Sequence, residues 1–441
     1  MGSQRSILIR KNIVAMFLRK GISTGIGLLL VPLILDYLDP TRYGIWLTLT
    51  SVIAWFYMFD IGLSNSFRNL FAKAKAKGET ILAREYVSTA YFVLGFISVG
   101  LCLAFFFVYP HVAWANLFNS PKGMEKDIAY LVLVVFAFFA MQFVARLISA
   151  LLLADQRPAL AEYFNTISSL LVLISVLILK ATTPPSLLTL GIVISASNLI
   201  VPIIASVILF HGRYREYAPR LGYIRIRHTR NLLGLGLLFF VIQIASVVVF
   251  ATDNMIISRL FGPADVMPYQ VSFKYFSLVS IAMAIMTKPY WSAITEAFAN
   301  RELGWIRKSI KLLKRIWLGT VVIVILMFLV SQTFFRIWLG DRLRIPELLC
   351  LFMGAWILLS TWVRIFGQFM NGVGKIRLSI YHSIVVMIIN IPLSIWLARD
   401  LGMGPKGVIL ATAICVLPQA ILHPIQYRRI ISGTAKGIWN K

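Results

Sequence analysis

The sequence predicts an all-α membrane protein whose chain crosses the bilayer about twelve times. Apolar residues make up 59% of the 441 residues and charged residues only 14%, against roughly 45–50% and about 25% in soluble domains. Apolar stretches recur at the length of a bilayer, and Lys and Arg gather in alternate connecting segments. This composition excludes a water-soluble enzyme, a disulfide-stabilised secreted module and a disordered chain.

The individual spans follow from the length of each apolar stretch, because crossing ~30 Å of hydrocarbon takes about 20 helical residues. Every connecting segment is short, and the longest outward one, 109–127, has 19 residues. No soluble domain is therefore expected between the spans. The predicted spans are 12–35, 43–64, 86–108, 128–153, 159–179, 187–210, 232–257, 266–293, 316–335, 348–370, 378–398 and 407–423.

The distribution of basic residues predicts which side of the membrane each loop occupies. With a cytoplasmic N-terminus, the inward segments hold 27 Lys and Arg residues and the outward segments hold 10. Because basic residues accumulate in cytoplasmic loops, both termini are expected in the cytoplasm. This bias and the attraction of anionic lipid headgroups account for the net charge of +26, so no nucleic-acid partner is expected.

The two halves of the chain resemble each other. Residues 142–163 align with residues 360–381, and this alignment places Arg146 opposite Arg364. Parallel six-helix halves are a known transporter plan, although chance similarity between apolar helices is the alternative. The predicted domains are an N-terminal six-helix bundle over 1–211, a basic cytoplasmic linker over 212–231 and a C-terminal six-helix bundle over 232–441.

Four motifs resemble those of one family, namely Asp39–Trp46, Phe59–Arg68, Ala72–Glu79 and Thr252–Ser258. On the basis of these motifs, the chain resembles the O-antigen and polysaccharide flippases of the multidrug/oligosaccharidyl-lipid/polysaccharide (MOP) exporter superfamily. The resemblance extends over essentially the whole chain. The resemblance implies two six-helix bundles in the V shape of MATE transporters. It also implies that an undecaprenyl-pyrophosphate-linked oligosaccharide moves from the cytoplasmic to the outer leaflet of the bacterial inner membrane by alternating access.

Basic residues inside the predicted spans are the candidates for substrate binding. The predicted spans contain six basic residues but only three acidic ones. Each charge inside the membrane costs at least ~2.5–3.5 kcal/mol unless it contacts water or a partner. The positive excess therefore points to a hydrated cavity or an anionic ligand, and a pyrophosphate fits Arg and Lys donors. The alternatives are snorkelling to headgroups and capping of helix C-termini. The candidate residues are Arg19, Lys20, Arg146, Lys274 and Arg364.

Two of the acids are candidates for a gate or for ion coupling. Asp60 could pair with Arg19 or Arg68 and latch an inward gate, or simply end a helix. Asp253 could pair with Lys274, or it could bind H⁺ or Na⁺. Apart from this ion coupling, no cofactor or metal is expected, because the five His residues show no paired ligand spacing.

The sequence thus predicts transport without covalent chemistry. It contains no Walker A motif, no HExxH and no Gly-x-Ser-x-Gly elbow, so an enzyme is not expected. Two alternatives stay open: a cation-coupled drug antiporter, which would need an anionic cavity, and a membrane glycan polymerase or ligase. The expected partners are the lipid-linked oligosaccharide of O-antigen lipopolysaccharide or another surface polysaccharide, anionic lipids and other membrane proteins of polysaccharide assembly.

Overall fold

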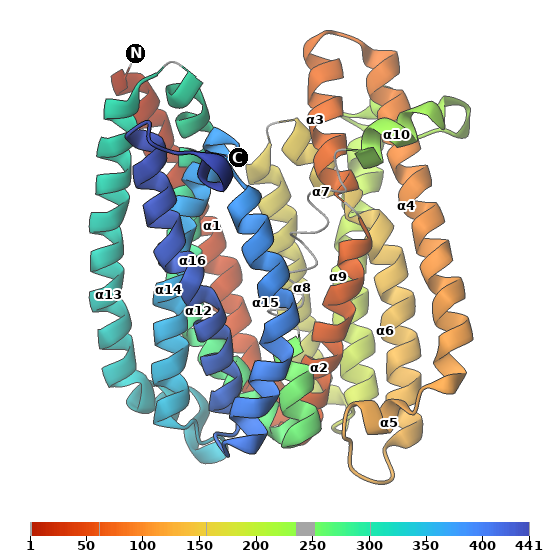
Figure 1. The fold of residues 1–441 in the computed structure, drawn as a ribbon. Coiled ribbons are helices and arrows are strands. Elements are labelled where there is room, and N and C mark those ends of the chain that lie inside the picture. The colour runs from red at the N-terminus through yellow and green to blue at the C-terminus, as the bar shows by residue number, and fades with distance from the viewer. Residues whose placement is uncertain (1, 61, 156, 235–251, 300, 441) are drawn as a thin grey trace. The chain divides into compact units, whose positions relative to one another are not determined.

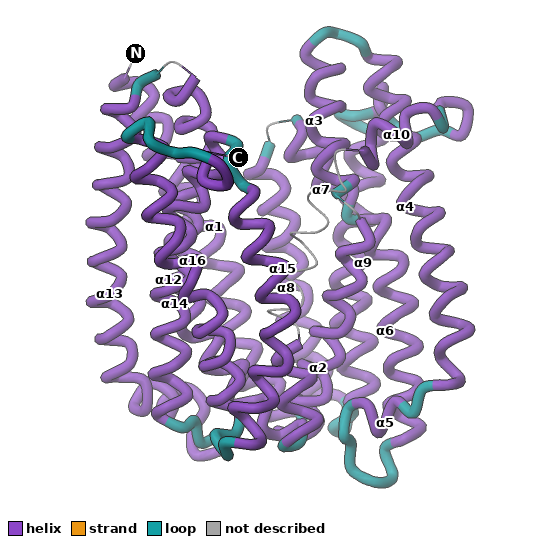
Figure 2. Tube along the Cα trace, viewed as in Figure 1, coloured by secondary structure: helices purple, strands orange, loops and turns teal. Residues whose placement is uncertain are grey.

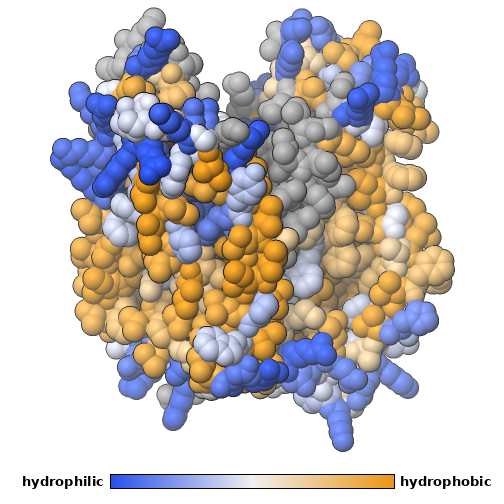
Figure 3. Space-filling model, in the orientation of Figure 1, coloured by the Kyte–Doolittle hydropathy of each residue, from blue (hydrophilic) through white to orange (hydrophobic). Residues whose placement is uncertain are grey.

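The computed structural model confirms the all-α polytopic membrane fold. All regular elements of the described residues are helices (Figure 2). Ten helical segments among them are long and apolar enough to cross a membrane. In the space-filling view of Figure 3, hydrophobic residues cover the middle of the molecule and hydrophilic ones gather toward the helix ends. The described residues are 2–60, 62–155, 157–234, 252–299 and 301–440.

The chain divides into two compact units (Figure 1). We call Arg19–Val247 together with Gly262–Ala264 the N-terminal unit. The C-terminal unit comprises Met1–Leu18, Val248–Phe261 and Asp265–Lys441. The long helix α1 (Gly2–Tyr37) contributes residues to both.

Helix α6 is central to the N-terminal unit, because it packs against both α4 and α9, while α3 packs against α4 and α7. Short helical turns join these elements, and α10 (Arg227–Gly234) packs on α3 and α4. The main helices are α2 (Pro40–Phe56), α3 (Leu63–Ala76), α4 (Thr80–Val108), α5 (Trp114–Leu117), α6 (Glu125–Ala145), α7 (Leu147–Ala154), α8 (Pro158–Thr182) and α9 (Leu187–His211).

Local sequence explains where α2 begins and how closely it packs. Asp39 is its N-cap and accepts a hydrogen bond from the Arg42 amide at 2.9 Å, and Pro40 occupies the first turn, where no amide donor is needed. Gly44 faces the backbone of Pro263 so closely that a Cβ atom would lie 1.7 Å from the Pro263 carbonyl oxygen. The motif Asp39–Trp46 therefore contains both the residues that start α2 and the glycine that lets α2 contact the Pro263 backbone.

In the C-terminal unit, α14 is the central helix and packs against α12, α13 and α16. A buried cluster that includes Met283, Ile310 and Phe366 fills the space between them. Both ends of the described chain lie at the same end of this unit (Figure 1). Its helices are α12 (Val266–Ala299), α13 (Leu303–Leu339), α14 (Glu347–Val373), α15 (Arg377–Ile395), a π-helical turn over Trp396–Asp400 and α16 (Pro405–Ile431).

Three predicted segments differ from the structure or fall outside it. The predicted span 43–64 is α2 with only 17 helical residues, continued by the 3₁₀ turn η1 (Tyr57–Asp60). The predicted inward loop 65–85 is instead largely helix α3, because Phe67 and Phe71 bury one face of it while Lys73 is exposed on another. The predicted span 232–257 lies mostly outside the described residues.

Candidate functional site

A cavity of about 250 Å³, lined by both charged and apolar side chains, lies in the N-terminal unit between η1, α3, α6 and α7. Arg68 and Arg146 line it together with Asp60, so the described lining carries one positive charge in excess. The full described lining is Tyr57, Asp60, Ser64, Arg68, Phe143, Arg146, Leu147, Ala150 and Leu153. We call it the Arg146 cavity.

Arg146 lies at the break between α6 and α7. Helix α6 ends at Ala145, and the Ser149 amide donates to the Arg146 carbonyl at 3.0 Å, an i+3 bond tighter than that of an α-helix. The Arg146 guanidinium carbon lies 4.4 Å from the centre of the Tyr57 ring, a cation–π contact. Because a guanidinium donates from its edges, stacking on its face leaves those donors available to an anion.

No ion pair neutralises Arg146 among the described residues, and its side chain is exposed to the cavity. Asp60 lines the same cavity, but its carboxylate is hydrogen-bonded to the backbone at the start of α3. Its two oxygens accept from the Ser64 amide at 3.1 and 3.4 Å, which fixes the start of α3. Asp60 and Arg68 share the cavity without forming an ion pair in the described chain, so the arginine donors there are not consumed by the carboxylate.

A chain of hydrogen bonds holds Tyr57 in position beneath Arg146. The Tyr57 hydroxyl donates to Gln142 Oε1 at 2.9 Å, and Gln142 Nε2 donates to the Ser195 carbonyl at 3.0 Å. These bonds join η1, α6 and α9. Gln142 is one helical turn before Arg146, which directly follows α6, so the C-terminal end of α6 both fixes the aromatic ring and positions the cation that stacks on it.

Asp155 fixes the inner turn between α7 and α8. Its carboxylate contacts Lys75, pairs with Arg157 at 3.1 Å and accepts from the Tyr214 hydroxyl at 2.6 Å. Burial raises the pKa of Asp155, but the hydrogen bonds from Lys75 and Tyr214 and the charges of Lys75 and Arg157 outweigh burial. The pKa of Asp155 therefore lies below its ordinary value. This acid ties the end of α3 to the turn that follows the Arg146 cavity.

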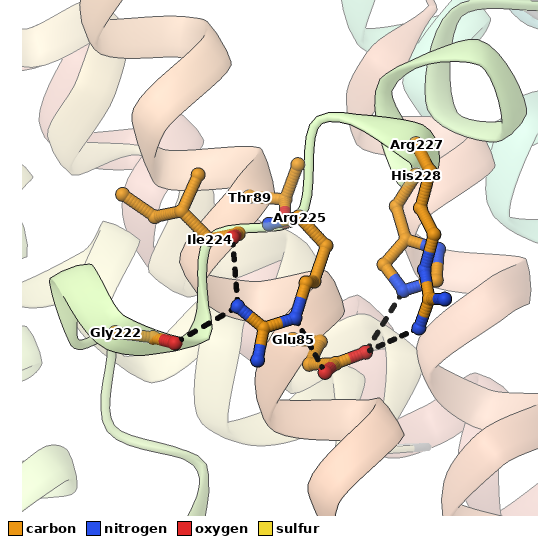
Figure 4. A network of polar contacts seen from close by, with 7 residues as sticks. All are labelled: Glu85, Thr89, Gly222, Ile224, Arg225, Arg227 and His228. Carbon is orange, nitrogen blue, oxygen red and sulfur yellow. Dashed lines mark hydrogen bonds and ion pairs between the residues drawn. The ribbon is translucent and has the colours of Figure 1, made fainter.

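Glu85 anchors the basic segment that the sequence predicts as a linker. Its side chain is only 9% exposed, and it pairs with Arg225 at 3.1 Å and with His228 at 2.9 Å (Figure 4). Arg227 approaches the second carboxylate oxygen at 3.8 Å. The Thr89 hydroxyl accepts from the Arg225 amide at 3.0 Å. The segment is thus fastened along α4 of the N-terminal unit.

The described lining of the Arg146 cavity does not include the other predicted substrate-binding residues. Lys20 is half-buried on α1, and the Arg19 side chain lies outside the described residues. In the C-terminal unit, Lys274 is half-buried on α12. Arg364 is half-buried on α14, where its buried Nε has no hydrogen-bond partner in the described chain.

Asp253 is 3% exposed and interacts with a tyrosine. One carboxylate oxygen accepts from the Tyr269 hydroxyl, and the other has no hydrogen-bond partner in the described chain. No ion pair joins Asp253 to Lys274, although both side chains are described. In the described chain, the side chain that hydrogen-bonds to Asp253 is therefore Tyr269 and not Lys274.

Sequence reasoning did not select Tyr57, Ser64 or Gln142. A polar residue one turn before an intramembrane arginine was the available signal for Gln142, because positions i and i+4 share a helix face. Nothing local identifies Tyr57, which meets Gln142 across 85 residues of chain.

Comparisons with known proteins agree with the fold and indicate a family. A family model described as "Polysaccharide biosynthesis protein" matches residues 9–295. A protein of Salmonella typhimurium provisionally named as an O-antigen transporter is 21% identical over 377 residues, which cover 82% of this chain and 83% of that protein. A protein of Yersinia pseudotuberculosis provisionally named as an O-antigen export protein is 19% identical over 79% of each chain.

Solved structures show the same fold. A multidrug resistance MATE family transporter of the MOP superfamily, solved in an inward-facing conformation, matches with a TM-score of 0.80. The match covers 96% of this chain and 98% of that one at 12% identity. The MATE-like helical fold expected from the resemblance is therefore confirmed.

Proposed function

Because the chain belongs to the polysaccharide biosynthesis protein family, we propose that it is a flippase of surface polysaccharide assembly. It moves an undecaprenyl-pyrophosphate-linked oligosaccharide, such as an O-antigen repeat unit, from the cytoplasmic to the outer leaflet of the bacterial inner membrane. The names of its Salmonella and Yersinia relatives support polysaccharide transport in general. The charge of the Arg146 cavity supports an anionic cargo.

The observation that carries the proposal is the arrangement of Arg146. Its cation is stacked on Tyr57, forms no ion pair in the described chain, and lines a cavity with Arg68 and Asp60. A pyrophosphate accepts several hydrogen bonds, and the planar guanidinium donates them in pairs. The cavity therefore replaces the water around the phosphates, while the lipid tail stays in the bilayer.

Transport then needs a conformational change and no bond formation. The site is exposed in turn to the cytoplasm and to the outside, with both termini in the cytoplasm. Moving one negative charge outward against an inside-negative potential contributes ~2.3 kcal/mol per 100 mV. Lys20, Arg19, Lys274 and Arg364 add diffuse positive charge along the route, which keeps binding weak enough for release, and anionic lipids contact the basic inner surface.

The acids supply the gate and the coupling in this proposal. Asp60 fixes the start of α3 and moves with it when the inward gate opens or closes. Asp253, with one buried oxygen unpartnered in the described chain, takes up H⁺ or Na⁺. An ionisable group held inside the membrane is costly unless it serves such a purpose.

The test is lipid translocation by the purified full-length protein in liposomes, with a labelled lipid-linked oligosaccharide. Arg146→Ala removes charge-assisted hydrogen bonds worth ~1.5–3 kcal/mol. The affinity for the lipid-linked oligosaccharide, and with it the translocation rate at low substrate and equal protein level, is expected to fall roughly ten- to hundredfold. Arg213→Ala, which removes an exposed arginine of the linker segment, is the matched control and keeps the wild-type rate.

Each alternative gives a different result in the same liposomes. A wild-type rate from Arg146→Ala would overturn the site assignment. Uptake of a cationic dye without lipid translocation would indicate the antiporter, whereas chain extension of the lipid-linked sugar would indicate a polymerase.

A further inference from the structure

A groove of about 260 Å³ lies in the N-terminal unit, between α4 and the basic segment 212–231 that follows α9. It shares no lining residue with the Arg146 cavity. Apart from one arginine, its described lining carries no charge. The lining is Ser88, Tyr91, Phe92, Pro219, Arg220, Leu221 and Ile224. We call it the Arg220 groove.

The segment that forms one wall of this groove is fastened to the first turns of α4. Arg84 Nε donates to the Ala218 carbonyl at 3.0 Å, and the Ser88 hydroxyl accepts from the Arg220 amide at 3.1 Å. The Glu85 ion pairs shown in Figure 4 hold the residues that follow. Backbone and side-chain bonds on both sides of Arg220 therefore fix the position of the groove on α4.

The apolar wall of the groove is continuous with exposed apolar surface. Phe92 is 46% exposed, and Phe96 and Val99 continue the exposed face along α4, which lies in a candidate membrane span. In the segment, Leu221 is 86% exposed and Ile226 is 77% exposed. Exposed apolar side chains on a membrane-spanning helix face acyl chains. Because Phe92 and Leu221 line one groove, we infer that the groove opens toward lipid.

Positive charge surrounds the polar end of the groove. The segment 212–231 contains six arginines, all of them exposed, and a single acidic residue. Glu85 pairs with Arg225 and approaches Arg227, but no ion pair neutralises Arg220 among the residues that the structure describes. A guanidinium binds phosphate oxygens in pairs, so a phosphate group complements Arg220.

A ligand of this groove has to match both an apolar wall and a cation. Basic and apolar side chains side by side are typical of protein surfaces that lie at the boundary between headgroups and acyl chains. Free phosphate would leave the wall of Phe92 and Leu221 uncovered, and an acidic protein would have to displace lipid from α4. A phospholipid matches both, with its phosphate at Arg220 and an acyl chain along Phe92.

We propose that the Arg220 groove binds an anionic glycerophospholipid from the membrane leaflet at the basic ends of the helices. The bound lipid holds the segment 212–231 at the membrane surface, where this segment leads from α9 toward the C-terminal unit. This role is separate from the transport of a cargo, and its test does not depend on the proposed function.

The experiment is photo-cross-linking of the full-length protein in phosphatidylcholine nanodiscs. The probe is phosphatidylglycerol with a diazirine on one acyl chain, and the labelled peptides are identified by mass spectrometry. Peptides that contain Phe92 or Leu221 are expected to be labelled roughly fivefold more by this probe than by diazirine-phosphatidylcholine, the factor typical of one basic residue near an anionic headgroup. Equal labelling by the two probes, or no labelling of these peptides, would overturn the inference.

Two substitutions separate a built site from diffuse surface charge. Arg220→Gln removes the cation but keeps the amide that donates to Ser88, so it reduces groove labelling to the phosphatidylcholine level with an unchanged unfolding midpoint. Arg220→Lys keeps the charge and most of the preference. Arg213→Gln is the matched control, because Arg213 is an exposed arginine of the same segment outside the lining, and it keeps the wild-type labelling. Equal losses in Arg220→Gln and Arg213→Gln would refute a specific site.

Competition distinguishes the sources of the phosphate. Excess unlabelled phosphatidylglycerol is expected to abolish the preferential labelling of the groove, whereas inorganic phosphate leaves it unchanged. Displacement by inorganic phosphate would indicate a site for free anions. Displacement by a prenyl phosphate at a level where phosphatidylglycerol has no effect would assign the groove to the lipid carrier. Either result would overturn the proposal.

Discussion

Replacing Gly44 by Ala tests a close approach between two backbone segments in the N-terminal unit. A Cβ atom at this position would lie 1.7 Å from the Pro263 carbonyl oxygen and 2.5 Å from its carbonyl carbon. Both atoms belong to the backbone, so no side-chain rotation relieves the overlap. Either α2 or the 262–264 segment has to move.

The magnitude follows from the kind of overlap. Inserting a methyl group into a packed site costs about 1–3 kcal/mol, occasionally more, and a rigid backbone neighbour places Gly44→Ala near the upper end. For a unit of this size, each kcal/mol lowers the unfolding midpoint by roughly 2–4 °C. The expected decrease of the N-terminal unit's midpoint is therefore roughly 6–12 °C.

The assay is thermal unfolding of the purified protein in detergent, followed by intrinsic tryptophan fluorescence. Gly95→Ala on α4 is the matched control, because no neighbouring atom lies within 4 Å of its added Cβ. Ala is also favoured over Gly in a helix by up to about 1 kcal/mol, so this control keeps or raises the midpoint. An unchanged midpoint for Gly44→Ala would refute the packing described here.

Three further predictions concern the polar contacts of the N-terminal unit. Tyr57→Phe keeps the ring under Arg146 but leaves Gln142 without its donor, so the free energy of unfolding falls by ~0.5–1.5 kcal/mol while calorimetric diphosphate affinity is kept; a loss of affinity would contradict this. Because the folded-state pKa of Asp155 is lowered, its stabilisation is complete above the ordinary value of about 3.9 and is lost as pH falls through the folded value. The wild-type unfolding midpoint should therefore fall more steeply than that of Asp155→Asn as pH falls from about 5 through the folded pKa of Asp155, and parallel curves would disprove the linkage. Glu85→Gln weakens the anchor of the basic segment, so trypsin should cleave that segment faster, and an unchanged cleavage rate would show that backbone contacts suffice.

Parts of the candidate site were visible in the sequence. Arg146 and Asp60 stand out because a charge inside an apolar stretch is a local feature that requires compensation. The structure brings these two residues to one cavity. It places Arg364, the counterpart of Arg146 in the repeat, at a half-buried position on α14 instead of in a matching arrangement. The repeat in sequence therefore does not extend to the surroundings of the two arginines.

The sequence by itself determined that the chain spans a membrane, because the length and polarity of apolar stretches are properties of contiguous residues. It also determined the family through motifs such as Asp39–Trp46. Only the tertiary structure decided which side chains surround Arg146. Tyr57 meets Gln142 across 85 residues, and Glu85 meets Arg225 across 140. Such pairings depend on how helices pack against each other, and helix periodicity fixes only the face that a residue occupies.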